Sequence, residues 1–341
     1  MSEDTSSSCH IECKESVDAQ NRNPSHIRMF NELLDTIRSF RKMDMLRILS
    51  DKTLDVSRSL NNGTTPLIVA VESDNVWAVQ VLIEHGTDVN ICGSTEDTKY
   101  VGFPVKRKET PLITAVRLGK EEIARVLVDN GALMEPPGCD MAALLWACNI
   151  GQIEIVRYLL DHGADVDVRG DYSFTALLEI VTESQSVDIL QLLLERGANL
   201  SMTSDTGNTA LMISLLLSAE HMANYLIRAG SDVNAINDTG LNPLAIAIGD
   251  LNPDVCELLV IAGAHITPEH LINLSTGYSA NAELHEWMTS ERRRPPSLMR
   301  LCTVAIRKQL LVVTKQRSIL ELIPRLPIPM HMHEYIVFNI F

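Results

Sequence analysis

Aromatic residues are scarce in this sequence, at 4% of its 341 positions, although 45% of the residues are hydrophobic. Such a composition favours small helices that interlock through leucine, isoleucine, valine and alanine, and it disfavours an aromatic-lined pocket. No apolar run reaches the roughly 18 residues that a membrane span requires. The opening MSEDTSSSCH also lacks the apolar core of a secretory signal. We therefore expect no membrane association and no secretion.

The cysteines, seven in number and irregularly spaced, do not form the pattern of a disulfide framework. Reduced thiols predict a protein of the cytosol or the nucleus. Cys9, His10 and Cys13 supply at most half of a zinc site, and a full set of spaced ligands is missing. The sequence therefore predicts no metal and no cofactor, and the polar segment 1–28 is predicted to be disordered.

The net charge of −15 is unevenly distributed along the chain. Residues 291–341 carry nine Lys or Arg and three Asp or Glu, a net of +6, which leaves the first 290 residues with a net of −21. Such a body repels a phosphate backbone, so nucleic acid is not expected as a partner. A basic protein partner and a merely solvated acidic surface are both compatible with this charge.

An internal repeat is the strongest feature of the sequence. Stretches such as GTTPLIVA (63–70) and ETPLITA (109–115) are each followed by an apolar stretch that ends in glycine. The closing glycines are Gly86, Gly131, Gly163, Gly197, Gly230 and Gly263, with gaps of 45, 32, 34, 33 and 33 residues. A period of about 33 is that of the ankyrin repeat.

Each position of the repeat has a physical reason. Thr caps a first helix and Pro is tolerated in its first turn, while the glycine ends a second helix in a left-handed conformation. Val79, Leu82 and Ile83 form an apolar stripe that only a neighbouring repeat can cover. The chain thus resembles the ankyrin family, although the family's His in Thr-Pro-Leu-His is replaced throughout. Segments 30–59 and 267–290 resemble degenerate terminal repeats.

The resemblance implies that loop tips and the exposed ends of the first helices bind a partner. Those positions include the polar Glu109 and Arg117, and a set of large apolar residues, which makes a protein-binding surface the prediction. The apolar set is Leu118, Met141, Ile150, Phe174, Leu216, Leu217 and Leu241. The alternative is that some of them pack against neighbouring helices. Trp146 is predicted to be core.

The gap of 45 residues places an insertion, 93–109, in the loop between two repeats. Tyr100 and Phe103 are followed there by three basic residues, so the insertion resembles an aromatic and basic finger that could contact a substrate. An insertion without function is the competing interpretation.

The segment ERRRPPSLMRLCTVAIRKQL (291–310) predicts a helix that begins after two prolines, with Ser297 as N-cap. Its apolar residues recur at helical spacing and give one apolar face on a segment too short to cover it: Leu298, Leu301, Cys302, Ala305 and Ile306. Further along, Pro327 and Pro329 hold an extended backbone that presents Leu326 and Ile328.

In order, these two motifs resemble the BC-box and the cullin-5 box of a SOCS box, so the chain resembles the ankyrin repeat and SOCS box family over residues 30–341. This implies a non-catalytic substrate receptor for a ubiquitin ligase. Elongin C, with elongin B, would bind through Leu298, Leu301, Cys302 and Ile306. Cullin-5, with its RING partner, would bind through Leu326, Pro327, Ile328 and Pro329, and the array would hold an unknown protein substrate.

The predicted fold is all-α: a disordered tail (1–28), an ankyrin solenoid (29–290) of about six regular repeats, and a small three-helix SOCS box (291–341). The stretch between Leu310 and Leu326 is longer than the family usually has. Two rival functions stay open. A plain scaffold would not recruit a ligase, and an enzyme is disfavoured because Cys139, Cys148 and Cys256 have no positioned His.

Overall fold

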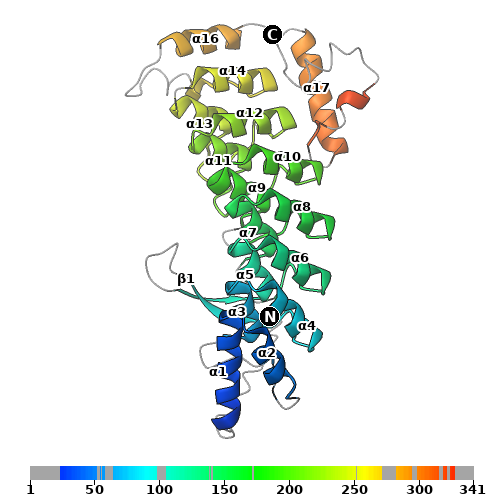
Figure 1. The fold of residues 1–341 in the computed structure, drawn as a ribbon. Coiled ribbons are helices and arrows are strands. Elements are labelled where there is room, and N and C mark those ends of the chain that lie inside the picture. The colour runs from blue at the N-terminus through cyan, green and yellow to red at the C-terminus, as the bar shows by residue number, and fades with distance from the viewer. Residues whose placement is uncertain are drawn as a thin grey trace, which may run out of the picture.

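The computed structural model describes residues 24–51, 54, 56–57, 64–97, 105–137, 139, 141–170, 173–250, 252–270, 282–293, 298–314, 318–320 and 323–326. Within these residues the chain is an elongated stack of short helix pairs, with the N-terminal helices at one end and α16 and α17 at the other (Figure 1). This confirms the predicted all-α ankyrin solenoid. Among the described elements, the strands are those of a single hairpin, and all the others are helices.

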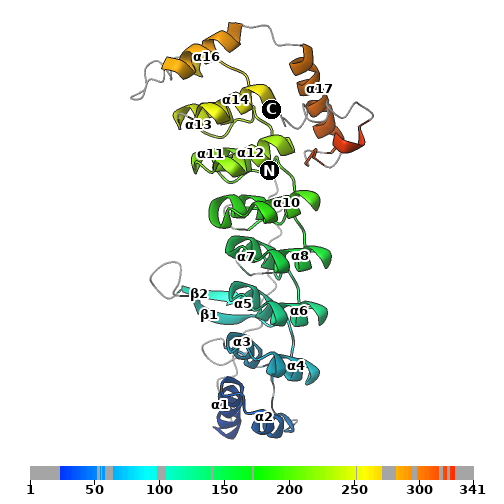
Figure 2. The ribbon, with the colours of Figure 1, turned by 45° about the horizontal axis from the view of Figure 1, so that its top comes forward.

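Each pair contributes one helix to each side of the stack (Figure 2). The first helices contact one another along one side, from α1 to α13, and the second helices from α4 to α14 contact one another along the other. The pairs are α1 (Pro24–Arg38) with α2 (Lys42–Leu49), α3 (Pro66–Glu72) with α4 (Val76–Glu84), α5 (Pro111–Arg117) with α6 (Glu121–Asp129), α7 (Ala143–Ile150) with α8 (Ile153–Asp161), α9 (Ala176–Glu179) with α10 (Val187–Glu195), α11 (Ala210–Leu216) with α12 (Glu220–Ala229), and α13 (Pro243–Gly249) with α14 (Pro253–Ala262).

Most first helices begin as the sequence predicts. The side chains of Thr65, Thr110, Thr209 and Asn242 accept a hydrogen bond from the backbone N–H three residues later. Such a cap satisfies one of the N–H groups that has no helical partner. Thr175 occupies the equivalent position before α9 without making this bond. The cap is therefore a property of the local geometry as well as of the residue type.

The closing glycines all adopt the left-handed conformation that the repeat requires, with φ between 82° at Gly86 and 107° at Gly263. A second left-handed residue lies in the turn inside each pair from α1 and α2 to α11 and α12. Gly119 and Gly151 occupy that turn in two repeats, whereas Gln185 and Ser218 occupy it in two others. A residue with a Cβ is strained there, so these turns carry a local cost that stacking must offset.

One repeat is 34 residues long, and a π-helical turn accommodates the additional residue. The segment η2 (Ile180–Ser184) continues α9, and the N–H of Gln185 donates to the carbonyl of Ile180 at 2.7 Å. This hydrogen bond spans five residues instead of four, which is how a single insertion is absorbed in a helix. The next helix, α10, therefore keeps its place in the stack.

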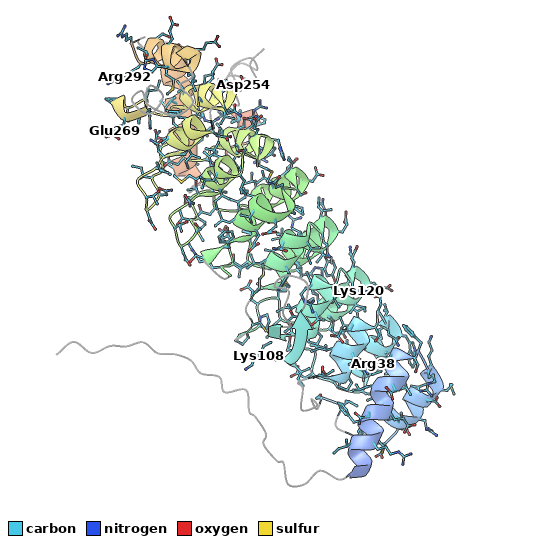
Figure 3. All side chains as sticks on the ribbon, turned by 90° about the vertical axis from the view of Figure 1, so that its left-hand side faces the viewer. Arg38, Lys108, Lys120, Asp254, Glu269 and Arg292 are labelled. Carbon is cyan, nitrogen blue, oxygen red and sulfur yellow. The ribbon has the colours of Figure 1, made fainter. Side chains whose placement is uncertain are left out.

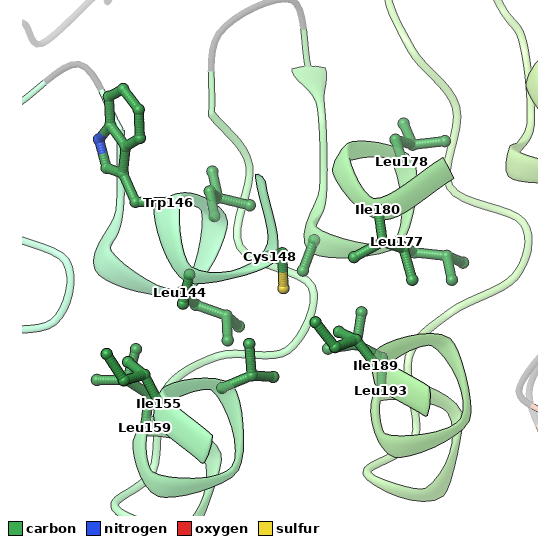
Figure 4. Close-up of a cluster of buried hydrophobic side chains, with 14 of the residues drawn as sticks. Leu144, Trp146, Cys148, Ile155, Leu159, Leu177, Leu178, Ile180, Ile189 and Leu193 are labelled. Atoms are coloured by element: carbon green, nitrogen blue, oxygen red, sulfur yellow. The ribbon is translucent and has the colours of Figure 1, made fainter. Parts of the chain in front are cut away.

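The core runs along the stack between the two rows of helices. Figure 4 shows its centre, where Leu144 and Cys148 of α7 meet Leu177 of α9 and Ile155 of α8. Trp146 is 5% exposed, in agreement with its prediction as a core residue. Because each repeat covers the apolar face of the next, burial is shared between neighbours.

Neighbouring repeats are also joined by hydrogen bonds between their loops. Asn90 donates from Nδ2 to the carbonyl of Gly131 at 3.2 Å and accepts from the N–H of Leu133 at 2.7 Å. Asn234 forms the same pair of bonds with the carbonyl of Gly263 and the N–H of His265. These asparagines fix the spacing of successive loops.

The insertion 93–109 contains a β-hairpin, whereas the sequence predicts a loop there. β1 (Gly93–Asp97) pairs antiparallel with β2 (Val105–Glu109), in a register that places Ser94 opposite Lys108 and Glu96 opposite Lys106. The hairpin projects from the side of the array near α5 (Figure 2). The tip, with Tyr100 and Phe103, lies outside the described residues.

The chain ends follow the array. α1 begins at Pro24, within the segment 1–28 that was predicted to be disordered, and residues 1–23 lie outside the described part. α16 (Ala282–Arg293) crosses the expected boundary at 290/291 and is followed by α17 (Leu298–Val313) and the 3₁₀ helix η3 (Ile323–Arg325). No helix among the described residues is long and apolar enough to span a bilayer.

Candidate functional site

Helix α17 carries the candidate elongin-binding motif, and a buried arginine anchors it to the array. Arg307 is 4% exposed, and its guanidinium donates to the carbonyls of Ile227 and Arg228 in the last turn of α12. A cation at a helix C-terminus is favoured by the exposed carbonyls and the helix dipole. Burial lowers the pKa of Arg307 to about 10, so the guanidinium stays charged at neutral pH.

Two further contacts hold α17 and the segment that follows it against the last repeats. Val304 lies over Gly263 at the end of α14, where an added Cβ would come within 3.2 Å of both valine methyl groups. After the helix, the N–H of Ile319 donates to the carbonyl of Ala229 at 3.0 Å. The packing of α17 beside α12 and α14 can be followed in Figure 1.

A small second core covers another side of α17. It consists of the buried residues Leu310, Ile319 and Ile323, with Ile306 and Leu326 packed against it. Ile306 was predicted to face elongin C and Leu326 to face cullin-5. Both are half-buried by residues of the chain itself. Part of the predicted elongin-binding surface and part of the predicted cullin-binding surface are therefore covered by other residues of this chain.

The face of α17 opposite Arg307 is exposed. Ala305, Gln309, Val312 and Val313 are all solvent-accessible, with Val312 at 67% and Val313 at 64%. At 100° per residue, these positions fall on the same side of a helix as positions 298 and 302. The predicted BC-box positions 298 and 302 thus fall, by helical spacing, on the side of the helix that the array leaves uncovered.

Several predicted ligase contacts lie where their surroundings are not described. Leu298, Leu301 and Cys302 fall within the first two turns of α17, which confirms that they are helical. The contacts of their side chains are not described. Pro327, Ile328 and Pro329 lie outside the described residues, as does the third helix predicted for the SOCS box.

The predicted substrate contacts divide into two groups. Leu118, Ile150, Leu216, Leu217 and Leu241 are exposed, with Leu216 at 53%. Three of these lie at equivalent positions, because Leu118, Ile150 and Leu217 directly precede the left-handed turn residues Gly119, Gly151 and Ser218, and Leu216 is the neighbour of Leu217. They therefore form an apolar row along one edge of the stack, which we call the edge row (Leu118, Ile150, Leu216 and Leu217).

Met141 and Phe174 do not belong to this exposed group. Both are half-buried and pack against the hydrophobic core, in agreement with the alternative that some predicted contacts lie against neighbouring helices. Each directly precedes the turn into a first helix, so its side chain helps to seal the repeat. Leu241 lies at a comparable position, but its backbone N–H and carbonyl bond to Asn237 and its side chain is left exposed.

The polar positions near the edge row contain a buried ion pair that the sequence does not reveal. Glu109 is 2% exposed, and the Nε of Arg117 donates to both of its carboxylate oxygens, at 2.9 and 3.1 Å. The hydroxyl of Thr114 adds a third bond to this carboxylate at 3.2 Å. Position in the repeat had placed Glu109 and Arg117 at a partner-facing surface. The correction follows from β2, which directs Glu109 inward at the base of the hairpin.

Charged side chains cover the outside of the array (Figure 3). Arg38 and Lys108 lie in its N-terminal part, and Glu269 and Arg292 at its C-terminal end. Among the described residues, no three His, Cys, Asp or Glu side chains are grouped to hold a metal. Cys9, His10 and Cys13, which could supply half of a zinc site, lie outside the described residues.

Two of the described thiols are deeply buried. Cys148 and Cys256 are fully shielded from solvent, and burial raises the pKa of both, to about 12 for Cys256. A neutral buried thiol packs as a small apolar group and is a poor nucleophile. Cys139 differs, because it lies partly exposed with its sulfur 4.0 Å from that of Cys92.

Comparisons with known proteins agree with these two parts of the chain. The family described as ankyrin repeats (3 copies) matches residues 18–92, 95–170, 133–204 and 177–270. The SOCS box family matches residues 294–336.

The human transient receptor potential cation channel subfamily A member 1 is 24% identical over 275 residues, which covers 72% of this chain and 22% of the channel. The chain thus spans less than a quarter of that relative. The solved ankyrin repeat domain of Bcl-3, a member of the IkappaB protein family, is similar with a TM-score of 0.53 and 23% identity. The match covers 70% of this chain and 99% of that domain, and it shows the fold alone. The ankyrin repeats and the SOCS box that follows them make this chain a member of the ankyrin repeat and SOCS box family.

Proposed function

We propose that this chain is the substrate-recognition subunit of a ubiquitin ligase, in which its SOCS box binds elongin C together with elongin B and recruits cullin-5 with its RING partner. An ankyrin array followed by a SOCS box supports such a receptor role in general. The observation that carries the proposal for this chain is the two-sided arrangement of α17. One face is anchored to the array by Arg307, and the opposite face is uncovered.

Elongin C is proposed to bind the uncovered face. Leu298 and Cys302 fall on that face by helical spacing, and Ala305 and Gln309 continue it. A small cysteine allows two helices to approach closely, and burying its uncharged thiol costs little. The exposed Val312 and Val313 extend the apolar area by a further turn.

Cullin-5 is proposed to bind near the end of the chain, through the motif Leu326, Pro327, Ile328 and Pro329. Two prolines in this motif favour an extended backbone that presents the aliphatic residues between them. Leu326 lies next to the second core, so the motif begins at a fixed distance from α17. The assembly would operate in the cytosol or the nucleus.

The target is proposed to bind along the edge row. Its four residues expose large apolar side chains at the ends of α5, α7 and α11, which marks a protein-binding surface. The hairpin projects beside α5 and is proposed to add contacts through Tyr100 and Phe103. The asparagine bonds between repeats hold the loops at a constant spacing, so little conformational entropy is lost on binding.

The receptor performs no bond chemistry in this proposal. It holds target lysines beside the ubiquitin-carrying enzyme and thereby raises their effective concentration. Proximity of this kind accelerates a reaction by orders of magnitude without a catalytic residue.

Co-expression of the full chain with elongin B and elongin C tests the proposal. We expect a stable ternary complex on size-exclusion chromatography, and we expect Leu298→Ala with Cys302→Phe to abolish it while helical content is unchanged. Leu46→Ala with Met43→Phe, at exposed positions on α2, is the matched control and should leave the complex intact. Recovery of the elongins with the double variant of α17 would refute the proposed interface.

A plain scaffold is the second candidate, and one observation favours it. Ile306 and Leu326, which the receptor proposal assigns to elongin C and cullin-5, are half-buried by the second core. If the tail packs only on the array, added elongins should leave its hydrogen exchange unchanged. If the receptor proposal is correct, elongins should protect the amides of α17 by tenfold or more.

A further inference from the structure

Two cysteines that are far apart in sequence meet beside the hairpin. Cys92 is the last residue before β1, and Cys139 lies in the loop that leads to α7. Their sulfur atoms are 4.0 Å apart and share a hydrogen bond. Both residues are partly exposed, unlike the fully buried Cys148 and Cys256.

A disulfide between them requires only a short movement. The sulfur atoms of a disulfide are about 2.05 Å apart, so the gap must close by roughly 2 Å. Neither cysteine lies within a helix or a strand, and rotation about χ1 together with a small loop shift supplies movements of this size. The closed pair would join loops of two successive repeats.

The surroundings favour the reactive thiolate form of Cys92. Its pKa is lowered to about 7, chiefly by the hydrogen bond from Cys139 and also by the charge of Lys108, against the opposing effects of partial burial and Asp88. Lys108 belongs to β2, in which it pairs with Ser94 next to the base of the hairpin. Thiolates are the nucleophiles in thiol oxidation, so Cys92 is the member of the pair that reacts first.

We propose that Cys92 and Cys139 form a redox-active thiol pair that a hydroperoxide converts into a disulfide linking the base of the hairpin to the loop before α7. Disulfides in reducing compartments are typically transient and redox-sensing. This pair has the required features, namely an accessible nucleophilic thiol with a second thiol in contact.

The peroxide is the oxidant, and it accepts the two electrons that the two thiols lose on forming the disulfide. The Cys92 thiolate attacks one peroxide oxygen, the O–O bond breaks, and the departing alkoxide or hydroxide takes up a proton and leaves a sulfenic acid on Cys92. The sulfur of Cys139 then attacks that of Cys92, the S–O bond breaks, and water leaves with the Cys139 proton. Two electrons pass from the two sulfurs to the peroxide. A dithiol reductant restores the two free thiols by thiol–disulfide exchange.

The cross-link has a structural consequence. Residues 93–109, which include both strands, follow Cys92 directly, and Glu109 at their end is fixed by Arg117. A covalent bond at Cys92 therefore fixes the other end of the hairpin as well. The amides of β1 should exchange more slowly in the oxidised chain, because opening of the hairpin base is restricted.

The test uses the full chain at pH 7, treated with hydrogen peroxide, denatured, alkylated and digested. Mass spectrometry should find a peptide pair linked through Cys92 and Cys139 that dithiothreitol separates. In Cys139→Ala the sulfenic acid on Cys92 should persist and be trapped by dimedone. Cys256→Ala removes a buried thiol and is the matched control, in which the linked pair should form as in the original chain.

Alkylation gives a second readout. At pH 7, Cys92 should react with iodoacetamide about sixfold faster than a thiol of pKa 9, since the larger thiolate fraction outweighs its lower nucleophilicity. Cys139→Ala should remove most of this advantage. The proposal is wrong if both cysteines stay alkylatable while added glutathione in the same solution is oxidised. It is equally wrong if Cys92 links mainly to Cys9, Cys13 or Cys302, or if its alkylation rate is unchanged in Cys139→Ala.

Discussion

Replacing Arg307 with methionine should loosen α17 from the array without unfolding the repeats. The guanidinium bonds to the carbonyls of Ile227 and Arg228 at the end of α12. Methionine fills a similar volume but cannot donate a hydrogen bond or complement the helix dipole. The array itself loses no apolar contact between repeats, so its stacking should persist.

The free energy lost on substitution follows from two favourable contributions of Arg307 and one opposing cost. The two charge-assisted hydrogen bonds contribute roughly 4 kcal/mol, with the longer one, 3.5 Å to Arg228, the weaker. The helix terminus adds about 1 kcal/mol. Burial lowers the pKa of Arg307 from 12.5 to about 10, which corresponds to a desolvation cost of about 3 kcal/mol. The net loss on substitution is therefore about 2 kcal/mol.

Hydrogen exchange of the full chain measures this loss locally. A change of about 2 kcal/mol in the opening of α17 raises the exchange rates of its amides roughly thirtyfold in the fast-closing regime. The amides of α5 and α7 should exchange as before. Arg293→Met, at an exposed position at the end of α16, is the control and should change neither set. Unchanged exchange in α17 of Arg307→Met would show that the guanidinium does not hold the helix.

The remaining predictions concern stability, measured by urea unfolding of the full chain. Ser218→Gly should raise the free energy of unfolding by about 0.5–1 kcal/mol, because φ is 51° there and glycine avoids the strain; a loss would contradict the assigned strain. Thr209→Ala should cost about 1 kcal/mol because its side chain caps α11, and Thr175→Ala should cost less because Thr175 makes no such bond. Equal losses at the two positions would count against the cap. Glu109→Gln should cost about 3 kcal/mol by leaving Arg117 buried with a weakened partner, and Arg117→Met in the same chain should restore part of the loss. If the second change only adds to the damage, the two residues do not act as a pair.

The regular part of the fold can be predicted from the sequence because each repeat carries the same local signals for helix starts, helix ends and packing. Threonine caps, closing glycines and apolar stripes recur at a fixed period, so every repeat supports the interpretation of the others. Even the 34-residue repeat was visible as a longer gap. What the gap could not show is that a π-turn ending at Gln185 absorbs the residue. That choice depends on packing against α7 and α11.

The binding surfaces were only partly predictable. Position in the repeat identified the exposed leucines, but it could not separate Leu241 from Phe174, which occupy similar places before a first helix. The difference depends on how each loop folds over its neighbour. Glu109 illustrates the same limit, since a charged residue at the end of an insertion gives no sign that Arg117 lies beneath it.

The anchoring of α17 and the thiol pair had no signal in the sequence. Arg307 lies on the polar side of an amphipathic pattern and would ordinarily be assigned to solvent. Its burial depends on α12, which is about 80 residues earlier in the chain. Cys92 and Cys139 are 47 residues apart, and their contact depends on how the hairpin enters α5. Long-range contacts of this kind require the assembled stack.

Native mass spectrometry of the full chain mixed with elongin B, elongin C and the N-terminal domain of cullin-5 tests the receptor assignment most directly. We predict one assembly that contains a single copy of each protein, and its loss when Leu298→Ala and Cys302→Phe are introduced. A chain that stays alone in the presence of all three proteins would contradict the assignment and leave a scaffold built from ankyrin repeats.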